Sequence, residues 1–228
     1  VRPLERSTAF PCPHMLAATF NTELANKYAM AVGEECRAGG IEILLGPGLN
    51  IARNLQNGRN FEYFSEDPLL TGKFAAAITK GVQKNRGCYV TLKNFCCNNQ
   101  EDNRNKTNAN VNERALREIY LKGFEIAITE SQPMSIMTSY NLINGVHAAN
   151  CEDTCTKAAR CEWGFQGMVT TDWWTRGEHY KEIKAGNDVK MATGYPERVK
   201  KAIELGELTR ADLEHCARRV LELILKID

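Results

Sequence analysis

Four short apolar runs of this sequence are each followed by polar or charged side chains. The runs span residues 41–45, 88–92, 134–138 and 168–171. Asp172 directly follows the last run, and Lys93 directly follows the second. A carboxylate can serve as a nucleophile or a proton donor, and a lysine can bind polar groups or form a Schiff base. These positions therefore predict a site for catalysis or for binding a polar small molecule.

The other side chains beyond the runs favour a sugar as that molecule. They include Arg59, Asn94, Arg104, Tyr140 and Trp173. Sugar hydroxyls need many polar partners, and the apolar face of a pyranose ring stacks on aromatic rings. No GxGxxG or phosphate-binding loop motif accompanies them. The four histidines lack the spacing of a metal site, so we expect neither a metal nor a cofactor.

Composition excludes several classes of protein. The 228 residues carry a formal net charge of +1, which argues against a nucleic-acid binder. No apolar stretch approaches the ~20 residues of a membrane span, and residues 1–6 do not lead into the apolar core of a secretory signal. The nine cysteines form no CxxC pair, and Cys88 and Cys216 stand in apolar segments. We therefore expect reduced thiols and a cytoplasmic protein.

The pattern of elements predicts an α/β fold. The four apolar runs lack clean alternation, as do strands buried on both faces of a parallel sheet, and 188–191 is a weaker fifth candidate. Helices are expected over 22–38, over 68–84, from Asn112 to about residue 130, and after a capping box at Thr209. The apolar stripe of the last helix, residues 213, 216, 220, 223, 224 and 227, is expected to face the core.

The number of strands bears on the architecture. A complete (β/α)₈ barrel needs eight strands in ~250 residues, and only four or five are visible here. We therefore expect an incomplete or truncated TIM-type barrel with parallel strands. In such barrels the active site lies at the carboxyl ends of the strands, where the polar residues named above stand.

Structural roles compete with each of these assignments. Asp172 could cap a helix, Lys93 could be a buried ion-pair partner, and Arg59 could pair with Glu62 or Glu66. Trp173 could belong to the core. The segment 98–112, with seven asparagines, could be a solvated loop.

Five ordered strings decide between these alternatives by resemblance. They are Gly58-Arg-Asn-Phe-Glu-Tyr-Phe-Ser-Glu-Asp-Pro68, Lys93-Asn-Phe, Asn98-Asn-Gln-Glu-Asp-Asn-Arg104, Met137-Thr-Ser-Tyr-Asn141 with Asn144-Gly145, and Val169-Thr-Thr-Asp-Trp173. Together they resemble the barrel domain of glycoside hydrolase family 3, in its β-glucosidase-type members. The resemblance runs from about Phe10 to the end of the chain.

The resemblance implies a role for each matching residue. Asp172 matches the nucleophile of a retaining mechanism. The residues that match contacts to the terminal sugar are Arg59, Lys93 and Arg104. Tyr140 matches the support of the nucleophile and the sugar ring, Met137 the pocket floor, and Trp173 a stacking wall.

Three departures from the family pattern are visible. Asn94 replaces the histidine of the usual Lys-His-Phe and is expected to bind the sugar in its place. The sugar-binding aspartate of the family lies in a segment that would precede Val1. The general acid/base, a glutamate, belongs to a separate α/β sandwich domain. We therefore expect residues 1–228 to be a single barrel domain that lacks its first strand segment and this second domain.

Three functions remain open from the sequence. The first is the barrel part of a retaining exo-β-glycosidase acting on β-glucosides or short β-glucans, with the acid/base domain supplied by the same chain or a partner. The second is a catalytically incomplete fragment or carbohydrate-binding module. The third is an aldolase with Lys93 as its Schiff-base residue.

Overall fold

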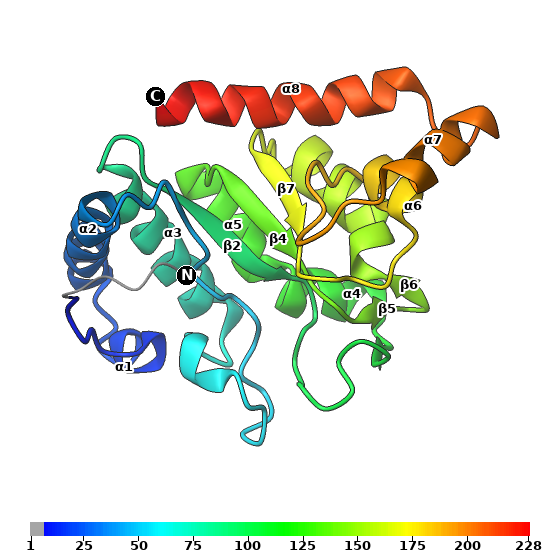
Figure 1. The fold of residues 1–228 in the computed structure, drawn as a ribbon. Helices are drawn as coiled ribbons and strands as arrows, with labels where there is room; N and C mark the ends of the chain where they lie inside the picture. The colour runs from blue at the N-terminus through cyan, green and yellow to red at the C-terminus, as the bar shows by residue number, and fades with distance from the viewer. Residues whose placement is uncertain (1–6) are drawn as a thin grey trace.

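The computed structural model describes residues 7–228, so the start of the chain, where we expected no secretory signal, lies outside the described residues. Its centre is a four-stranded parallel sheet (Figure 1). The strands, in their order across the sheet, are β1 (Ile43–Leu44), β2 (Tyr89–Phe95), β4 (Ser135–Thr138) and β7 (Met168–Thr171). Each coincides with or overlaps one of the four apolar runs, and β4 and β7 are buried along their whole length, as expected for strands covered on both faces.

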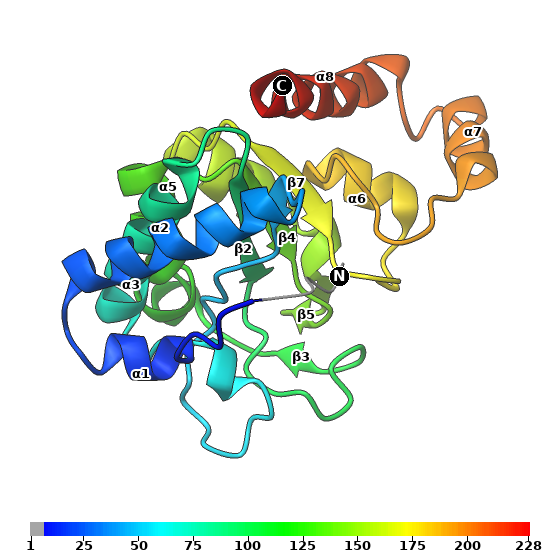
Figure 2. The ribbon, with the colours of Figure 1, turned by 60° about the vertical axis from the view of Figure 1, so that its left-hand side comes forward.

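Helices connect and cover these strands. Their bounds are α1 (Pro13–Ala17), α2 (Thr22–Ala38), α3 (Pro68–Gln83), α4 (Glu113–Ala115), α5 (Lys122–Ser131), α6 (His179–Ala185), α7 (Pro196–Glu204) and α8 (Arg210–Ile227). α3 packs between α2 and α5 along one side of the sheet (Figures 1 and 2). The sequence did not reveal α1, α6 or α7.

The helix ends follow from local chemistry. The Asn21 side chain accepts a hydrogen bond from the Leu24 N–H at 2.9 Å and begins α2. Gly40, with φ of +64°, lies just beyond the end of that helix. Asp67 caps α3, whose first residue is Pro68, and Thr209 and Asp212 form the expected capping box of α8.

Three expectations about elements held only in part. The helix predicted from Asn112 to about residue 130 contains a π-helical turn, Leu116–Tyr120, between α4 and α5. The weak strand at 188–191 is reduced to one bridge between Val189 and Thr170, although main-chain hydrogen bonds join the segment to β7, among them that of the Thr171 N–H to the Val189 carbonyl at 3.0 Å. In α8 only Cys216 and Leu223 of the apolar stripe are buried, and Ile224 is exposed, because the helix contacts the sheet along a narrow line.

A second, small sheet was also not predicted. It joins β3 (Asn108–Ala109), β5 (Leu142–Ile143) and β6 (Val146–His147). The Asn144 side chain accepts from the Val111 N–H and donates to its carbonyl, at 2.9 and 2.8 Å. The asparagine-rich segment is thus tied to the loop after β4 and is more than a solvated loop.

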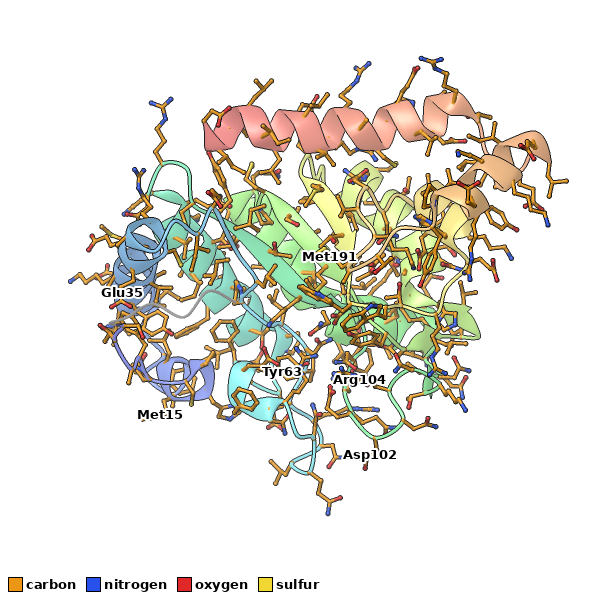
Figure 3. All side chains as sticks on the ribbon, viewed as in Figure 1. Met15, Glu35, Tyr63, Asp102, Arg104 and Met191 are labelled. Carbon is orange, nitrogen blue, oxygen red and sulfur yellow. The ribbon has the colours of Figure 1, made fainter. Side chains whose placement is uncertain are left out.

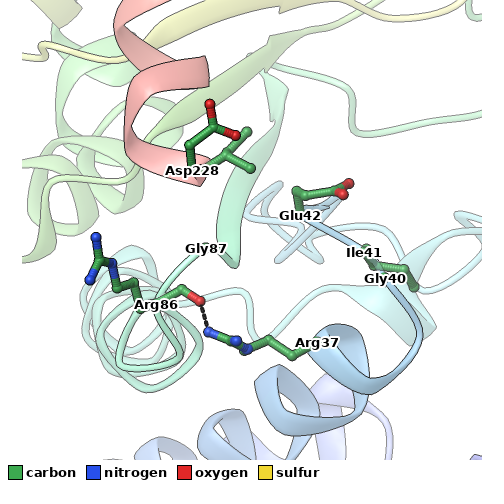
Figure 4. A pocket seen from close by; sticks show the side chains of 8 residues that line it. Arg37, Gly40, Ile41, Glu42, Arg86, Gly87 and Asp228 are labelled. Atoms are coloured by element: carbon green, nitrogen blue, oxygen red, sulfur yellow. Dashed lines mark hydrogen bonds between the residues drawn. The ribbon is translucent and has the colours of Figure 1, made fainter.

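The two ends of the parallel sheet differ. α8 crosses the amino-terminal end, where the Tyr89 hydroxyl donates to the Lys226 carbonyl at 2.7 Å (Figure 1). A hollow of about 410 Å³ opens there, between Arg37, Glu42, Arg86 and Asp228 (Figure 4). The predicted site residues lie at the other end, where the loops leave the strands. In barrels, residues at the amino-terminal end serve stability and those at the carboxyl end serve the reaction.

Two further findings bear on the expectations. All nine cysteines are free thiols, and Cys88 and Cys216 are buried. None of the helices in residues 7–228 is both long enough and apolar enough to cross a membrane.

Candidate active site

The structure brings the eight predicted site residues together around one cavity of about 180 Å³. Its lining consists of Leu45, Arg59, Lys93, Asn94, Arg104, Met137, Tyr140, Asp172 and Trp173. They come from the ends of β1, β2, β4 and β7 and from the loops that follow. Figure 3 shows Arg104 on the side of the molecule opposite α8. Residues that are up to 128 positions apart in the sequence (45 and 173) therefore share one cavity.

Asp172 is the carboxylate of this cavity. It directly follows β7, and 7% of its surface is exposed. The Trp173 N–H donates to its Oδ1 at 2.8 Å, and the Asn94 Nδ2 donates to its Oδ2 at 2.8 Å. The next helix, α6, begins only at His179 and has Glu178 at its N-cap, so the helix-capping role considered for Asp172 is wrong. Its carboxylate is held by two donors and faces the cavity.

Asn94 is fully buried, and its amide orientation is fixed by chemistry. An ionised carboxylate only accepts hydrogen bonds, so the Nδ2 of Asn94 must face Asp172. The Oδ1 of Asn94 has no hydrogen-bond partner among the described residues. This oxygen is itself buried, so its acceptor capacity is unused within the wall of the cavity.

The cavity lining contains three basic side chains, those of Arg59, Lys93 and Arg104, and two glutamates pair with them. Glu62 pairs with Arg59 at 2.5 Å and with Lys93 at 3.0 Å. Glu101 pairs with Arg104 at 2.6 Å and approaches Arg59 at 3.9 Å. Burial raises the pKa of Glu62, but the hydrogen bond from Arg59 and the charge of Lys93 outweigh it and leave this pKa below its usual value. The basic side chains are thus held by carboxylates at fixed positions around the cavity.

Tyr140 lies between a cation and a carboxylate. The guanidinium of Arg104 stacks on its ring, 4.3 Å from the ring centre. Burial, and then the nearby charge of Asp172, raise the pKa of Tyr140 to about 12. The phenol therefore stays protonated at neutral pH and can donate a hydrogen bond.

Apolar surface completes the cavity. Met137 is the buried third residue of β4 and contributes to the lining. Trp173 is partly exposed and lines the cavity, so its possible role in the core is wrong. The site thus combines one buried carboxylate, three cations, amide and phenol donors, and an indole wall.

The sequence missed the organising residues of the site. The pairing of Arg59 with Glu62 that the sequence offered is confirmed, but the second contact of Glu62, to Lys93, and the pairing of Glu101 with Arg104 were not predicted. Asn50 was not selected, although it hydrogen-bonds the main chain of Asn94. Its place at the end of Gly46-Pro-Gly-Leu-Asn50, after the first apolar run, was the available signal. Two further acidic residues of the motifs, Glu66 and Asp102, are exposed. Within residues 7–228, no cluster of side chains is arranged to hold a metal ion.

The chain is similar in sequence to known glycosidases. The chain is 47% identical over 208 residues to beta-glucosidase A of Butyrivibrio fibrisolvens, covering 91% of this chain and 25% of that protein. It is 41% identical to the exo-alpha-(1->6)-L-arabinopyranosidase of Bifidobacterium longum, covering 96% of this chain and 29% of that protein. The chain thus spans about a quarter of the length of the curated relatives it matches.

Solved structures match the fold as well. The beta-glucosidase 3B of Thermotoga neapolitana in complex with alpha-D-glucose superposes with a TM-score of 0.92 at 42% identity, covering 96% of this chain and 32% of that one. The GH3 beta-glucosidase of Bifidobacterium adolescentis gives a TM-score of 0.93 at 39% identity, with 98% and 34% covered. The fold class is therefore the expected one, α/β with a parallel sheet and part of a (β/α) barrel. The model of the glycosyl hydrolase family 3 N-terminal domain matches residues 1–223, and the chain belongs to this family.

Proposed function

We propose that this chain is the nucleophile-bearing part of a retaining exo-β-glycosidase that removes terminal β-D-glucosyl residues from β-glucosides or short β-glucans. Asp172 attacks the anomeric carbon and forms a glycosyl ester while the bond to the leaving oxygen breaks. A second carboxyl group gives its proton to that oxygen. Water then hydrolyses the ester and restores Asp172.

The observation that carries this proposal is the environment of Asp172. Its carboxylate is buried, hydrogen-bonded on both oxygens, and open to a cavity whose other charged lining residues are three cations. A nucleophile needs this fixed orientation, because productive geometry lowers the barrier only when the reacting atoms are held close. The wall of Trp173 suits the apolar face of a pyranose.

The remaining residues receive roles in sugar binding. Arg59, Lys93 and Arg104 donate to ring hydroxyls, and Asn94, beside them in the lining, binds the sugar in place of the family's histidine. Tyr140 donates to the nucleophile or the sugar ring, and Met137 forms the floor. Hydrogen bonds to the hydroxyls that strengthen in the transition state increase the rate.

We propose that the proton donor lies outside residues 1–228. Glu62 and Glu101 are both paired with basic side chains of the cavity, which suits a charged carboxylate rather than an acid. The relatives are about four times longer than the part matched here. We place the acid, a glutamate, in a further domain of the same or a partner chain.

We also place the protein in the cytoplasm, because its cysteines are free thiols.

Covalent labelling tests the nucleophile. A 2,4-dinitrophenyl 2-deoxy-2-fluoro-β-D-glucoside carries a leaving group that needs no protonation, so the assay does not depend on the missing acid. We expect release of dinitrophenolate and one fluoroglucosyl adduct, found on Asp172 by peptide mass spectrometry. Asp172→Asn should remain unlabelled, and Asp153→Asn, a change at an exposed aspartate, should label normally. A folded protein without an adduct would refute the proposal.

A second candidate follows from the length of the chain. Because it spans about a quarter of its relatives, the chain by itself could bind sugar without turnover. Calorimetric binding of glucose without either hydrolysis of an aryl β-glucoside or labelling of Asp172 would favour this carbohydrate-binding role. The aldolase role gains no support, because Lys93 is paired with Glu62 at 3.0 Å and a Schiff-base lysine must be neutral.

A further inference from the structure

Asn50 is a buried asparagine outside the cavity lining. It hydrogen-bonds Asn94, which in turn hydrogen-bonds Asp172. Asn50 is 3% exposed and follows β1. Its Nδ2 donates to the main-chain carbonyl of Asn94 at 3.0 Å, and its Oδ1 accepts from the Asn94 N–H at 2.9 Å. A main-chain N–H only donates and a carbonyl only accepts, so both ends of the Asn50 amide are fixed.

These two bonds determine where the Asn94 side chain points. With its main chain clamped on both sides, Asn94 directs its Nδ2 to the Oδ2 of Asp172 at 2.8 Å. The three residues stand after β1, near the end of β2 and directly after β7. A line of three buried hydrogen bonds therefore crosses the sheet and ends on the carboxylate.

The pairing of the two strands does not need Asn50. The Leu49 N–H donates to the Lys93 carbonyl at 2.6 Å, and the Lys93 N–H donates to the Pro47 carbonyl at 3.1 Å. The segment after β1 is thus already joined to β2. What the Asn50 amide adds is the orientation of Asn94 alone.

We propose that Asn50 is a positioning residue for the reaction, acting through Asn94 to fix the orientation of the Asp172 carboxylate. This inference rests on the proposed function. A carboxylate that rotates freely spends less time aligned with the anomeric carbon, and small misplacements of reacting groups cost up to about 100-fold in rate. Asn50 does not line the cavity, so its loss should leave sugar binding nearly unchanged.

The experiment separates rate from affinity. In the complete native polypeptide that carries this sequence, the fluoroglucoside gives a rate constant for labelling Asp172 and a separate binding constant. We expect Asn50→Ala to lower the rate constant about 10- to 100-fold while the binding constant changes less than about 2-fold. Asn99→Ala is the matched control, because Asn99 is also a buried amide bonded to one carbonyl, that of Ile51, at 2.6 Å. It should keep the parent rate constant.

A double-mutant cycle tests the route. If Asn50 acts through the Asn94 amide, Asn50→Ala in an Asn94→Ala background should cause no further loss of rate. Additive losses, an unchanged rate constant for Asn50→Ala, or a rise in the binding constant alone would each overturn the inference. Should Asn50→Ala not fold, the near-isosteric Asn50→Asp, which puts a carboxylate oxygen in place of the donor to the Asn94 carbonyl, gives the same readout. Absence of labelling in the parent protein would instead refute the proposed function.

Discussion

At the scale of single residues, acidic side chains of this chain do different work because their partners differ. Asp172 is held by an amide and a main-chain N–H and faces a cavity. Glu62 and Glu101 hold the cations of that cavity in place. Glu182 is completely buried and pairs with Lys190 at 2.6 Å, away from the cavity lining. Residue type alone does not distinguish these roles, because burial and partners define them.

The buried pair yields a stability prediction. Lys190→Met would leave the Glu182 charge buried without its partner, since the side chains of Lys190 and Glu182 are 4% and 1% exposed. We expect the free energy of unfolding in urea to fall by about 3–5 kcal/mol. Lys157→Met is the control, because Lys157 pairs with Asp153 at the same 2.6 Å but in solvent. Its unfolding midpoint should stay near that of the parent. Equal shifts for the two variants would contradict this account.

At the scale of elements, the helices that support the sheet meet through small residues. Gly72 in α3 faces Ile126 in α5, and a Cβ placed on Gly72 would lie 2.7 Å from the Ile126 Cβ. That atom is not the free end of a flexible side chain, so one helix would have to shift. The close approach of α3 and α5 therefore requires glycine at this position.

Substitution of this glycine should show the conflict between packing and helix propensity. Alanine favours a helix over glycine by about 1 kcal/mol, but overpacking costs about 1–3 kcal/mol. We expect Gly72→Ala to lower the free energy of unfolding, measured in urea. In an Ile126→Gly background, which removes the Ile126 Cβ and with it the contact, the same change should raise it. A loss of equal size in both backgrounds would rule out the contact with Ile126 as the cause.

At the scale of the whole molecule, three apolar side chains near the end of α8 are exposed together. Leu221 and Leu225 are 58% and 76% exposed, and Ile224 lies beside them on the helix. In Figure 2, α8 lies at the edge of the molecule, away from the loops that follow the carboxyl ends of the strands. Contiguous exposed apolar side chains promote association in water.

This face predicts the behaviour of the chain in solution. We expect concentration-dependent self-association in sedimentation velocity, reduced by the double change Leu221→Lys and Leu225→Lys. Leu55→Lys is the control, because Leu55 is 92% exposed in a loop on the opposite side of the sheet from α8. It should leave the association unchanged. Equal effects of both variants would point to net charge rather than to the α8 face.

The sequence by itself determined the elements that depend on local chemistry. Short apolar runs identified all four strands of the parallel sheet, and Pro68, Asn112 and Thr209 marked helix starts. The rule that barrel sites follow strand ends, together with five motifs, selected eight residues that share one cavity. Local signals suffice here because capping and hydrophobic burial act over a few residues.

Only the tertiary structure decided which groups meet. The small sheet around β3 depends on pairing between segments more than 30 residues apart, and the π-helical turn at Leu116–Tyr120 has no local signature that we recognised. The pairing of Glu62 with Lys93 and the clamp of Asn50 on Asn94 likewise join separate strands. Such contacts are set by the positions of strands in the sheet, and a linear sequence does not contain those distances explicitly.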